Sequence, residues 1–562
     1  MVRVSEQIDP ITAEVIRQAF VAASDEMKIN LTRTSYNPII YEVLDFSVGL
    51  FDTTGGLIAQ AAGLPFFLGN MAEAVRVVQS DAEDDGFVSG DVYLINDTYT
   101  AGTHLNDVTA VTPVFVDERL VGFTASRAHW IDVGARDPGG WLSDTTEIYQ
   151  EGLRLRSVRL YEGGKLNASI QRLLEDNVRY HESVMGDLRA QVAAARTGEQ
   201  RFAEIVEKWG LEIVEQAVAA SFARAEARTR AAIEAIPDGV YHASAFLDDD
   251  GVAVDRPTVE VSVLVSADTI TIDLAGSEAT CVGPTNCGYA ATVSACRVAL
   301  KAVTDPLEEV NEGTFAPLQV SVPADCMFNA QRPAPAGVYG IPMITLCDTI
   351  WRALAPALPD LVPSGHFADL GTLFLYGDHG RDGKPWIHAE PQGGGWGAGP
   401  HGDGESMLIC IADGDTRNVP VEIIESKYPL RVERYALREG SGGAGAHRGG
   451  LGQYRDYRVL DPSTRMTAAT ERTLCPPWGL RGGKEGGTGE FVLNPGREGE
   501  RKLKKASGLN LEESDVVSSR TGGGGGWGNP ADRPATAIEA DLAAGYISAD
   551  AASEDYGYRA VG

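Results

Sequence analysis

The chain has 562 residues, more than a single hydrophobic core accommodates, so two or three packed domains are expected. Its 48 basic and 79 acidic side chains give a formal charge of −31. The chain therefore lacks the excess of basic residues that nucleic-acid-binding proteins show. No run of about 18 apolar residues occurs, so no membrane-spanning segment is expected. Seven Cys without a CxxC pair, and no apolar leader, predict a cytoplasmic protein with reduced thiols.

The N-terminal part is predicted to contain one helix and two β-hairpins. Apolar residues recur at helical spacing from 10 to 34, and Asp9 occupies the N-cap position directly before Pro10. The run 45–61 is typical of two strands around a glycine-containing turn. Further strands are predicted at 91–99, 108–116 and 120–129, the last two forming the second hairpin.

Helical periodicity dominates from 166 to 235 and stops at Pro237-Asp238-Gly239. Beyond it, two strands, a helix and then a series of strands separated by glycine clusters are predicted, at 258–267, 269–276, 290–305, 428–439, 453–460 and 489–496. The fold is therefore expected to be mixed α+β and multi-domain. It would have a hairpin-rich, metal-binding N-terminal part, a helical middle segment and a β-rich C-terminal part. The expected domains are 1–235, 236–424 and 425–562.

Two glycine-rich segments superficially match nucleotide-binding motifs. GSGGAG at 440–445 fits G-x-G-x-x-G, but a strand-like run follows where a dinucleotide-binding fold requires a helix. GGGGGW at 522–527 lacks the GK[ST] ending of a phosphate-binding loop. Both are interpreted as tight glycine turns, so the sequence indicates no nucleotide site in this chain.

His104 and Asp107 are candidate metal ligands that lie three residues apart, just after Gly102. Residues three apart on a regular strand face opposite sides, so these two converge only if the segment is a loop or a bulge. On the pattern alone, a metal site and a pair of hydrogen-bonded structural residues both remain open, because H-x-x-D is a weak motif.

His129 joins these two residues if the second hairpin turns between Asp117 and Glu118. Antiparallel pairing then places residues whose numbers sum to 235 (117 + 118) opposite one another, so His129 would face Asn106. Two imidazoles and one carboxylate form a ligand set that suits Zn, Mn or Fe better than Ca or Mg. Nothing in the sequence itself brings Asp45 close to them.

Carboxylates that follow the hairpin are candidates for orienting a water molecule or accepting its proton, with solvated loop residues as the alternative. They are Asp132, Glu147 and Glu151. A Ser or Cys nucleophile is not indicated, because no G-x-S-x-G occurs and no Cys has a His near it in sequence.

The same stretches resemble the hydantoinase B and oxoprolinase family along nearly the whole chain. The matching passages are DFSVGLFD (45–52), GTHLNDVTAVTPVF (102–115), SRAHWIDVGARDPGG (126–140), EIYQEGLRL (147–155), GDLRAQVAA (186–194), NCGYAATVSACRVALKAVTD (286–305), NEGTF (311–315), RPAPAG (332–337) and SGGAGAHRGGLGQYRDYR (441–458). This family includes B-type subunits of ATP-dependent hydantoinases, 5-oxoprolinases and caprolactamase, and is similar to subunits of acetone and acetophenone carboxylases.

The resemblance implies a divalent metal ion, Zn or Mn, held by four residues: Asp45, His104, Asp107 and His129. It also implies that Asp132 or Glu151 positions water or substrate. Trp130 departs from the family pattern, since many members have a second His beside the ligand.

The resemblance further implies a partner, an A-type subunit that binds ATP, in an A2B2 assembly. The partner would phosphorylate a small cyclic amide, a lactam, hydantoin or 5-oxoproline, and this chain would hydrolyse the activated ring. Two alternatives remain: a subunit of an ATP-dependent ketone carboxylase, and a non-catalytic scaffold with a structural metal ion.

Overall fold

The computed structural model of the protein describes residues 8–84 and 86–559. Its N-terminal sheet contains β1 (Phe46–Phe51), β2 (Leu57–Gln60), β3 (Val92–Ile95), β4 (Asp107–Val116), β5 (Arg119–His129), β6 (Val158–Glu162) and β7 (Lys165–Leu166). The strand order is β2-β1-β5-β4-β3-β6-β7. The helices around it are α1 (Pro10–Thr34), α2 (Pro38–Tyr41), α3 (Pro65–Leu68), α4 (Met71–Asp81), α5 (Ala168–Asn177) and α6 (His181–Trp209), with a short 3₁₀ turn, η1, at Ile148–Gln150.

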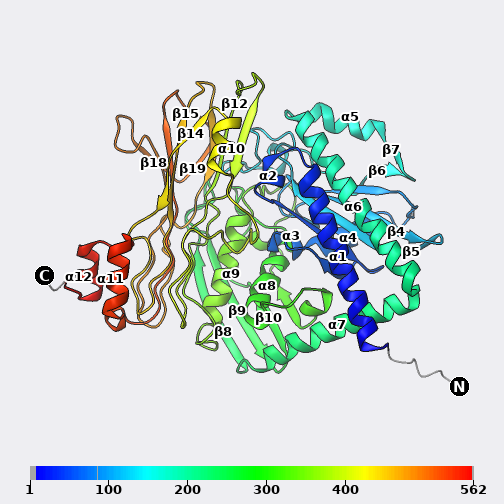
Figure 1. The fold of residues 1–562 in the computed structure, drawn as a ribbon, viewed down its shortest axis with the longest axis horizontal. Coiled ribbons are helices and arrows are strands. Elements are labelled where there is room, and N and C mark those ends of the chain that lie inside the picture. The colour runs from blue at the N-terminus through cyan, green and yellow to red at the C-terminus, as the bar shows by residue number, and fades with distance from the viewer. Residues whose placement is uncertain (1–7, 85, 560–562) are drawn as a thin grey trace.

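Helices cover both faces of this sheet (Figure 1). α1 and α6 pack side by side on one face, whereas α4 packs on the other. Successive residues of β4 accordingly enter two different hydrophobic clusters: Ala110 lies in the cluster that includes α6, and Val111 lies in the cluster that includes α4. The sheet is therefore buried on both sides. Polar side chains consequently gather at the ends of its strands.

The first helix confirms its local sequence signals. α1 spans Pro10–Thr34, and the Asp9 side chain accepts a hydrogen bond from the Thr12 backbone N–H at 2.9 Å. Pro10 occupies the first helical position, where the absence of an N–H group removes no helical hydrogen bond. Ile16, Phe20 and other residues of one face are buried against α6.

The central part of the chain continues from a long helix into a second sheet and two stacked helices. Its elements are α7 (Leu211–Glu234), β8 (Gly239–Phe246), β9 (Thr258–Ser266), β10 (Thr269–Asp273), α8 (Tyr289–Thr304), η2 (Glu312–Phe315), β11 (Leu318–Ser321), η3 (Met327–Asn329) and α9 (Gly340–Leu354). The sheet order is β11-β10-β9-β8, with α9 against it and α8 against α9. The predicted helical stretch from 166 to 235 is confirmed as α5, α6 and α7.

The C-terminal part contains two further sheets. Its elements are β12 (Thr372–Gly377), β13 (Trp386–Glu390), α10 (Val421–Lys427), β14 (Leu430–Leu437), β15 (Gln453–Val459), β16 (Arg465–Ala469), β17 (Glu490–Leu493), β18 (Arg501–Leu503), β19 (Lys505–Asn510), β20 (Val516–Arg520), η4 (Pro530–Asp532), α11 (Ala535–Ala544) and α12 (Ala549–Tyr556). The orders are β13-β12-β16-β19 and β14-β15-β20-β17-β18. The expected mixture of helices and sheets is confirmed. One of these sheets joins strands from both sides of position 425, while the limits of the expected domains stay predictions.

The glycine run at 522–526 is extended backbone rather than the tight turn that the sequence suggested. Its N–H groups donate in succession to carbonyls of other segments, those of Gly487, Gly450, Gly365 and Lys484, at 2.8–2.9 Å. A Cβ atom on Gly524 would lie 1.9 Å from the carbonyl oxygen of Trp396. Glycine is required here because neighbouring backbones approach the run from several sides.

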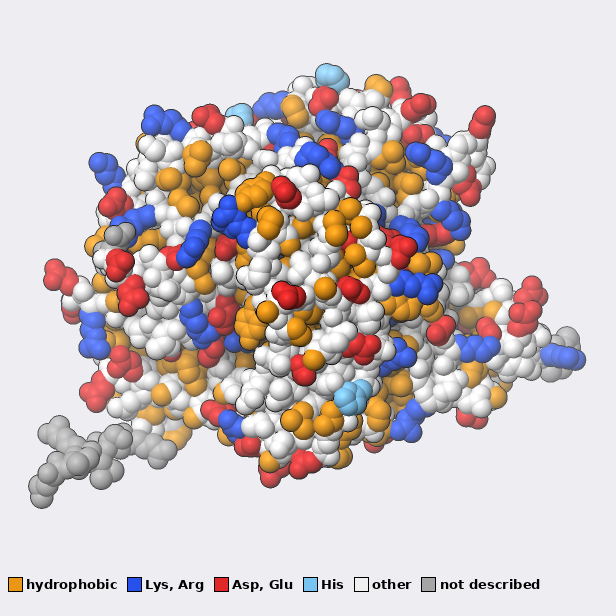
Figure 2. Space-filling model, turned by 180° about the vertical axis from the view of Figure 1, so that it is seen from behind, with side chains coloured by type: hydrophobic (Ala, Val, Ile, Leu, Met, Phe, Trp, Pro, Cys, Tyr) orange, Lys and Arg blue, Asp and Glu red, His pale blue; other side chains and the backbone are white. Residues whose placement is uncertain are grey.

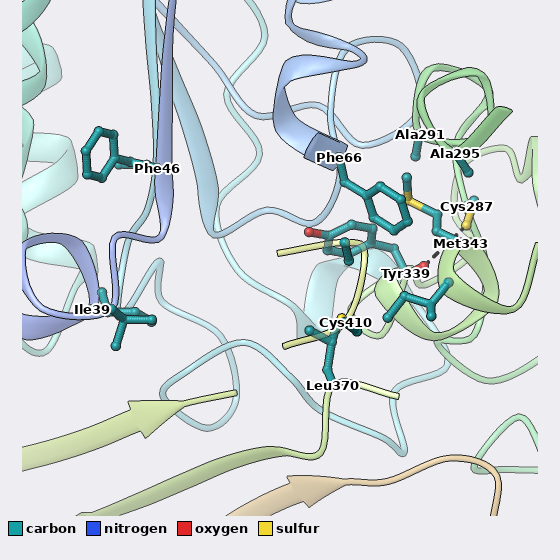
Figure 3. Packing of buried hydrophobic residues seen from close by; sticks show 14 of the residues in the cluster. Ile39, Phe46, Phe66, Cys287, Ala291, Ala295, Tyr339, Met343, Leu370 and Cys410 are labelled. Atoms are coloured by element: carbon teal, nitrogen blue, oxygen red, sulfur yellow. Dashed lines mark hydrogen bonds between the residues drawn. The ribbon is translucent and has the colours of Figure 1, made fainter. Parts of the chain in front are cut away.

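One large hydrophobic cluster connects the N-terminal sheet with the central helices and the C-terminal part. Figure 3 shows Phe66 of α3 and Tyr339 next to residues of α8 and α9, with Leu370 and Cys410 below them. Tyr339 is therefore held by residues that come from distant parts of the chain.

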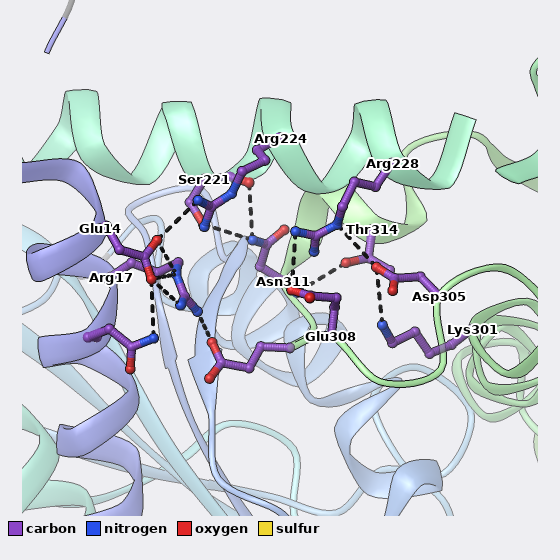
Figure 4. A network of polar contacts seen from close by, with 12 residues as sticks. Glu14, Arg17, Ser221, Arg224, Arg228, Lys301, Asp305, Glu308, Asn311 and Thr314 are labelled. Carbon is purple, nitrogen blue, oxygen red and sulfur yellow. Dashed lines mark hydrogen bonds and ion pairs between the residues drawn. The ribbon is translucent and has the colours of Figure 1, made fainter. Parts of the chain in front are cut away.

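A polar network joins α1 and α7 to the segment that follows α8 (Figure 4). Arg224 donates to Glu14 at 3.0 Å, Arg228 donates to Asp305 at 3.2 Å, and the Asn311 side chain donates to the Ser221 hydroxyl at 3.0 Å. The charged side chains of this network are partly exposed, so its ion pairs connect the helices but add little to the free energy of unfolding.

Charged side chains of both signs are scattered over the face shown in Figure 2. In the described part of the chain, no helix is both long and apolar enough to cross a membrane.

Candidate functional site

The hairpin of β4 and β5 carries two of the candidate ligands. Its two turn residues, Asp117 and Glu118, both have positive φ (48° and 63°), as in the type I′ turn that matches the twist of paired strands. Next to the turn the predicted register holds, since Val116 faces Arg119.

A bulge then shifts the pairing by one residue, between Val114 and Phe115. His129 consequently faces Asp107, and the predicted partner Asn106 is wrong. His129 therefore lies directly opposite the candidate ligand Asp107, rather than opposite its neighbour Asn106.

His104, Asp107 and His129 form a closed triangle of buried donor atoms. His104 Nε2 lies 3.0 Å from Asp107 Oδ1 and 3.2 Å from His129 Nδ1, and His129 Nδ1 lies 3.2 Å from Asp107 Oδ1. Atoms at these separations could all bind one transition-metal ion, because the usual bond length is roughly 2.1 Å. The donor set therefore fits such an ion.

The triangle is held by short local contacts. His104 lies in the turn before β4, where the Asp107 N–H donates to the His104 carbonyl at 3.2 Å, as the predicted loop required. The Thr103 hydroxyl donates to Asp107 Oδ2, which leaves Oδ1 facing the imidazoles. Burial alone would raise the pKa of Asp107, but the charge and hydrogen bonds of the two His lower it well below its usual range.

Strand pairing brings Asp45 to the wall of the same cavity, although its carboxylate is not one of the ligand atoms that lie within 4.8 Å of one another. β1 pairs with β5, and the His129 N–H donates to the Asp45 carbonyl at 3.1 Å. Asp45 Oδ1 is shielded from solvent, and no partner for it occurs within residues 8–84 and 86–559. Burial and the negative charges of Asp107 and Asp413 raise the pKa of Asp45 well above its ordinary value. An unpaired carboxyl oxygen here is what a cation would satisfy.

A small cavity opens beside the triangle. It is lined by Ile39, Asp45, Leu64, Phe67, His104, Asp107, His129, Trp141, Tyr339, Leu370, Thr372, Phe374, Ala389, Glu390, Pro391 and Asp413. Aromatic rings surround the imidazoles: the centroids of His104 and Tyr339 are 5.0 Å apart, and the Trp141 ring meets His104 edge-on at 5.5 Å. The arrangement can hold a small molecule beside a metal ion and against a partly apolar wall.

Two cavity carboxylates, Glu390 and Asp413, were missed by sequence reasoning. They come from the C-terminal half, and no motif marks either of them. Glu390 accepts hydrogen bonds from Tyr457 and the Val419 N–H and pairs with Arg455 at 3.2 Å. Burial and the charge of Asp107 raise the pKa of Asp413 to about 7.

Asp132 lies outside the lining of this cavity. Its carboxylate pairs with the Arg179 guanidinium at 2.8 Å and also accepts the backbone N–H groups of Gly134 and Arg179. These contacts attach the loop after β5 to the start of α6, so a structural role accounts for Asp132. Glu147 is exposed and caps the turn η1.

Glu151 is buried beneath the cavity rather than lining it. It accepts hydrogen bonds from the Thr145 hydroxyl at 2.7 Å and from the N–H groups of Ala336 and Gly337 at 3.0 and 2.9 Å. Burial raises the pKa of Glu151 to about 7. The contacts anchor the loop that leads to Tyr339, so Glu151 positions that side chain.

Replacing Glu151 with alanine is expected to lower the free energy of unfolding by about 2 to 4 kcal/mol, because two buried N–H groups lose their acceptor. Urea unfolding followed by circular dichroism measures this. Glu234→Ala, at an exposed position of α7, should change the value by less than about 0.5 kcal/mol. Equal effects of the two changes would contradict the anchoring role.

Trp130, the departure from the family pattern, is fully buried behind the site. Its indole N–H donates to the Gln191 side chain of α6 at 2.7 Å. The cavity lining does not include it, so this substitution leaves the lining unchanged.

Known proteins are similar to this chain along nearly its whole length. Residues 9–530 match the family described as hydantoinase B/oxoprolinase. The chain is 34% identical to an uncharacterized protein of Methanocaldococcus jannaschii (98% of this chain, 96% of the other). It is 31% identical to the putative B-type subunit of a D-/L-hydantoinase from a Pseudomonas species (98% and 95%). The latter name describes one component of a larger enzyme.

Two solved structures share the fold. The ATP-dependent caprolactamase of Pseudomonas jessenii superposes with a TM-score of 0.90 at 28% identity, covering 99% of this chain and 97% of that one. The nucleotide-free structure of acetone carboxylase has a TM-score of 0.87 at 19% identity (98% and 79%), a likeness of fold alone.

Proposed function

Because this chain belongs to the hydantoinase B/oxoprolinase family, we propose that it is the hydrolytic subunit of an ATP-dependent enzyme that opens cyclic amides. The observation that carries the proposal is the triangle of His104, Asp107 and His129 at the wall of a cavity lined with aromatic rings. These three residues, with Asp45 as the fourth ligand, would hold a divalent ion, Zn or Mn.

A bound ion would polarise the substrate oxygen and lower the pKa of water at the site. The protein's own residues do the rest. Thr103 holds Asp107 in its orientation, and the rings of Trp141 and Tyr339 exclude bulk water and confine the substrate. We assign the proton that water loses on attack to Asp413, a carboxyl group that lines the same cavity.

ATP is needed because an unactivated amide resists water. Phosphorylation of the amide oxygen makes its carbon a better electrophile, and the ring opens when the C–N bond breaks. Overall, one cyclic amide, one ATP and two water molecules give the ring-opened amino acid, ADP and phosphate. We propose that ATP binds to an A-type partner subunit, in an A2B2 assembly. In support, the glycine run of this chain is packed against other backbone.

Reconstitution with an A-type subunit tests the proposal. The complex would be offered lactams, hydantoins, or a ketone with bicarbonate, and ADP release and ring-opened product would be measured. Product that appears with a cyclic amide and requires both subunits and ATP is the expected result. ADP released only with ketone and bicarbonate would instead identify a carboxylase, the alternative suggested by the shared fold. If the complex hydrolysed cyclic amides without the metal ion, this chain would be a non-catalytic scaffold.

A further inference from the structure

A groove on the surface of this chain carries more cationic than anionic side chains. Its charged lining residues are Arg179, Arg381, Lys384, Lys427, Glu182 and Asp382. Two of the cations are paired, Arg179 with Asp132 at 2.8 Å and Lys384 with Glu182 at 3.3 Å. The chain as a whole has 48 basic and 79 acidic residues. A local excess of cations on so acidic a protein attracts an anionic ligand.

Arg381 and Lys427 are the two cations of this basic groove that no carboxylate neutralises. Arg381 Nε donates to the Tyr428 carbonyl at 2.9 Å, and Lys427 Nζ donates to the Tyr41 hydroxyl at 3.0 Å. Both side chains are exposed, and neither forms an ion pair within residues 8–84 and 86–559. Each group has further N–H donors for a ligand, and guanidinium and ammonium groups are the usual partners of phosphate oxygens.

Aromatic rings form another part of the groove wall. They belong to Tyr36, Tyr180, Trp386 and Tyr428. The ring centroids of Trp386 and Tyr428 are 5.9 Å apart, and Tyr36 is 52% exposed. Because aromatic side chains pack well against a flat ring, the groove suits a molecule that has both a ring and an anionic group.

The basic groove lies beside the cavity at the triangle. β13 contributes Ile387 to the groove and Ala389 to the cavity, and α2 contributes Pro38 to the groove and Ile39 to the cavity. Two residues of a strand span roughly 7 Å. The two hollows therefore share a wall, and a ligand in the groove lies next to the cavity.

The proposed reaction requires a phosphorylated ring to enter a cavity that is itself acidic. Four carboxyl groups line this cavity, those of Asp45, Asp107, Glu390 and Asp413. Neither Lys nor Arg of the described residues lines it. A phosphoryl group gives the ring negative charge, so the acidic protein repels it at a distance, and cations beside the cavity counteract this repulsion.

We propose that the basic groove binds the phosphoryl group of the activated ring before the ring enters the cavity. Arg381 and Lys427 contact the phosphate oxygens, and the aromatic wall packs against the ring. The inference rests on the proposed function, which supplies the phosphorylated species, and it adds the place where this chain receives that species. The hollow shape and the shared wall favour a small anion over an acidic segment of a partner protein.

Binding of phenyl phosphate to the full-length chain tests the groove directly. This stable compound has one ring and one phosphoryl group, and its binding would be followed by phosphorus NMR. The double variant Arg381→Gln/Lys427→Gln is expected to bind it at least about tenfold more weakly, because two cationic contacts are lost. An unchanged affinity overturns the proposal.

A second double variant, Arg501→Gln/Lys504→Gln, is the matched control. It removes the same charge from exposed positions outside the groove, so it should bind phenyl phosphate as tightly as the unmodified chain. Equal weakening in both double variants would mean that net charge alone attracts the anion, and the proposal would be wrong. Metal content would be measured in every sample, because phosphate also binds metal ions.

Inorganic phosphate separates the two possible sources of a phosphoryl group. Phenyl phosphate should bind more tightly than inorganic phosphate, since only phenyl phosphate has a ring that packs against the aromatic wall. If inorganic phosphate bound at least as tightly, the groove would hold the phosphate that the reaction releases, and the assignment to the activated ring would fail.

The reconstituted complex tests the role in the reaction. An activated ring that is not captured loses its phosphoryl group to water and returns the cyclic amide, so ADP forms without product. Arg381→Gln/Lys427→Gln should therefore release severalfold less ring-opened product per ADP, with unchanged metal content. An unchanged ratio overturns the proposal. Loss of subunit association, measured by analytical ultracentrifugation, would also overturn it, because the groove would then bind the partner protein.

These measurements separate the inference from the proposed function. If phenyl phosphate binds through Arg381 and Lys427 while the complex opens no cyclic amide, the anion site stands and the proposed function fails. If the complex opens cyclic amides and the double variant binds and couples normally, the proposed function stands and the inference fails.

Discussion

His104→Ala is expected to remove the metal ion and to lower ATP-coupled ring opening by roughly three orders of magnitude. His104 Nε2 contacts both other corners of the triangle, so its loss leaves only two of the three ligand atoms that lie together, with Asp45 as the one further carboxylate. Metal content would be measured by elemental analysis, and activity as ADP and product formed by the reconstituted complex.

Two comparisons make this result interpretable. His242→Ala removes an exposed imidazole on β8, which is hydrogen-bonded to the Ser262 hydroxyl at 2.8 Å, and should keep both metal and activity. Asp107→Asn keeps the shape of the site while removing its negative charge, and it should also lose the metal. If His104→Ala lost the ion and retained full turnover, the metal would be structural and the catalytic assignment would be wrong.

Gly524→Ala should destabilise the C-terminal part by at least about 3 kcal/mol, the upper end for overpacking a buried site. The new Cβ would lie 1.9 Å from the Trp396 carbonyl oxygen and 2.2 Å from its carbonyl carbon. These atoms are backbone, so no side-chain rotation relieves the clash. The Gly524 N–H also donates to the Gly450 carbonyl at 2.9 Å, and any shift of this segment weakens the hydrogen bond.

Gly402→Ala is the matched control. No atom described by the structure lies within 4 Å of its added Cβ, and its φ is not positive. The midpoint of urea unfolding should stay near that of the unmodified protein for Gly402→Ala and fall for Gly524→Ala. A Gly524→Ala protein as stable as the control would mean that the neighbouring backbones do not pack as tightly as this structure indicates.

Elements that local chemistry controls were predictable. α1 begins and ends where its cap, its proline and its apolar spacing indicate. The hairpin of β4 and β5 turns at Asp117 and Glu118 as expected, because the signals lie within a few residues of the turn. The register further along the same hairpin was wrong by one residue, because a bulge depends on what packs against the strands rather than on the turn.

The candidate site also has a part that the sequence predicts and a part that it does not. The sequence by itself determined the donor types and the nearness of His104 to Asp107, since both follow from residue chemistry and short chain distance. The tertiary structure alone decided that Asp45 lies next to His129, that Glu390 and Asp413 enter the cavity, and that no Lys or Arg of the described chain lines it. Such neighbours are set by strand pairing and by burial of apolar surface between distant segments, which leave no local pattern to read.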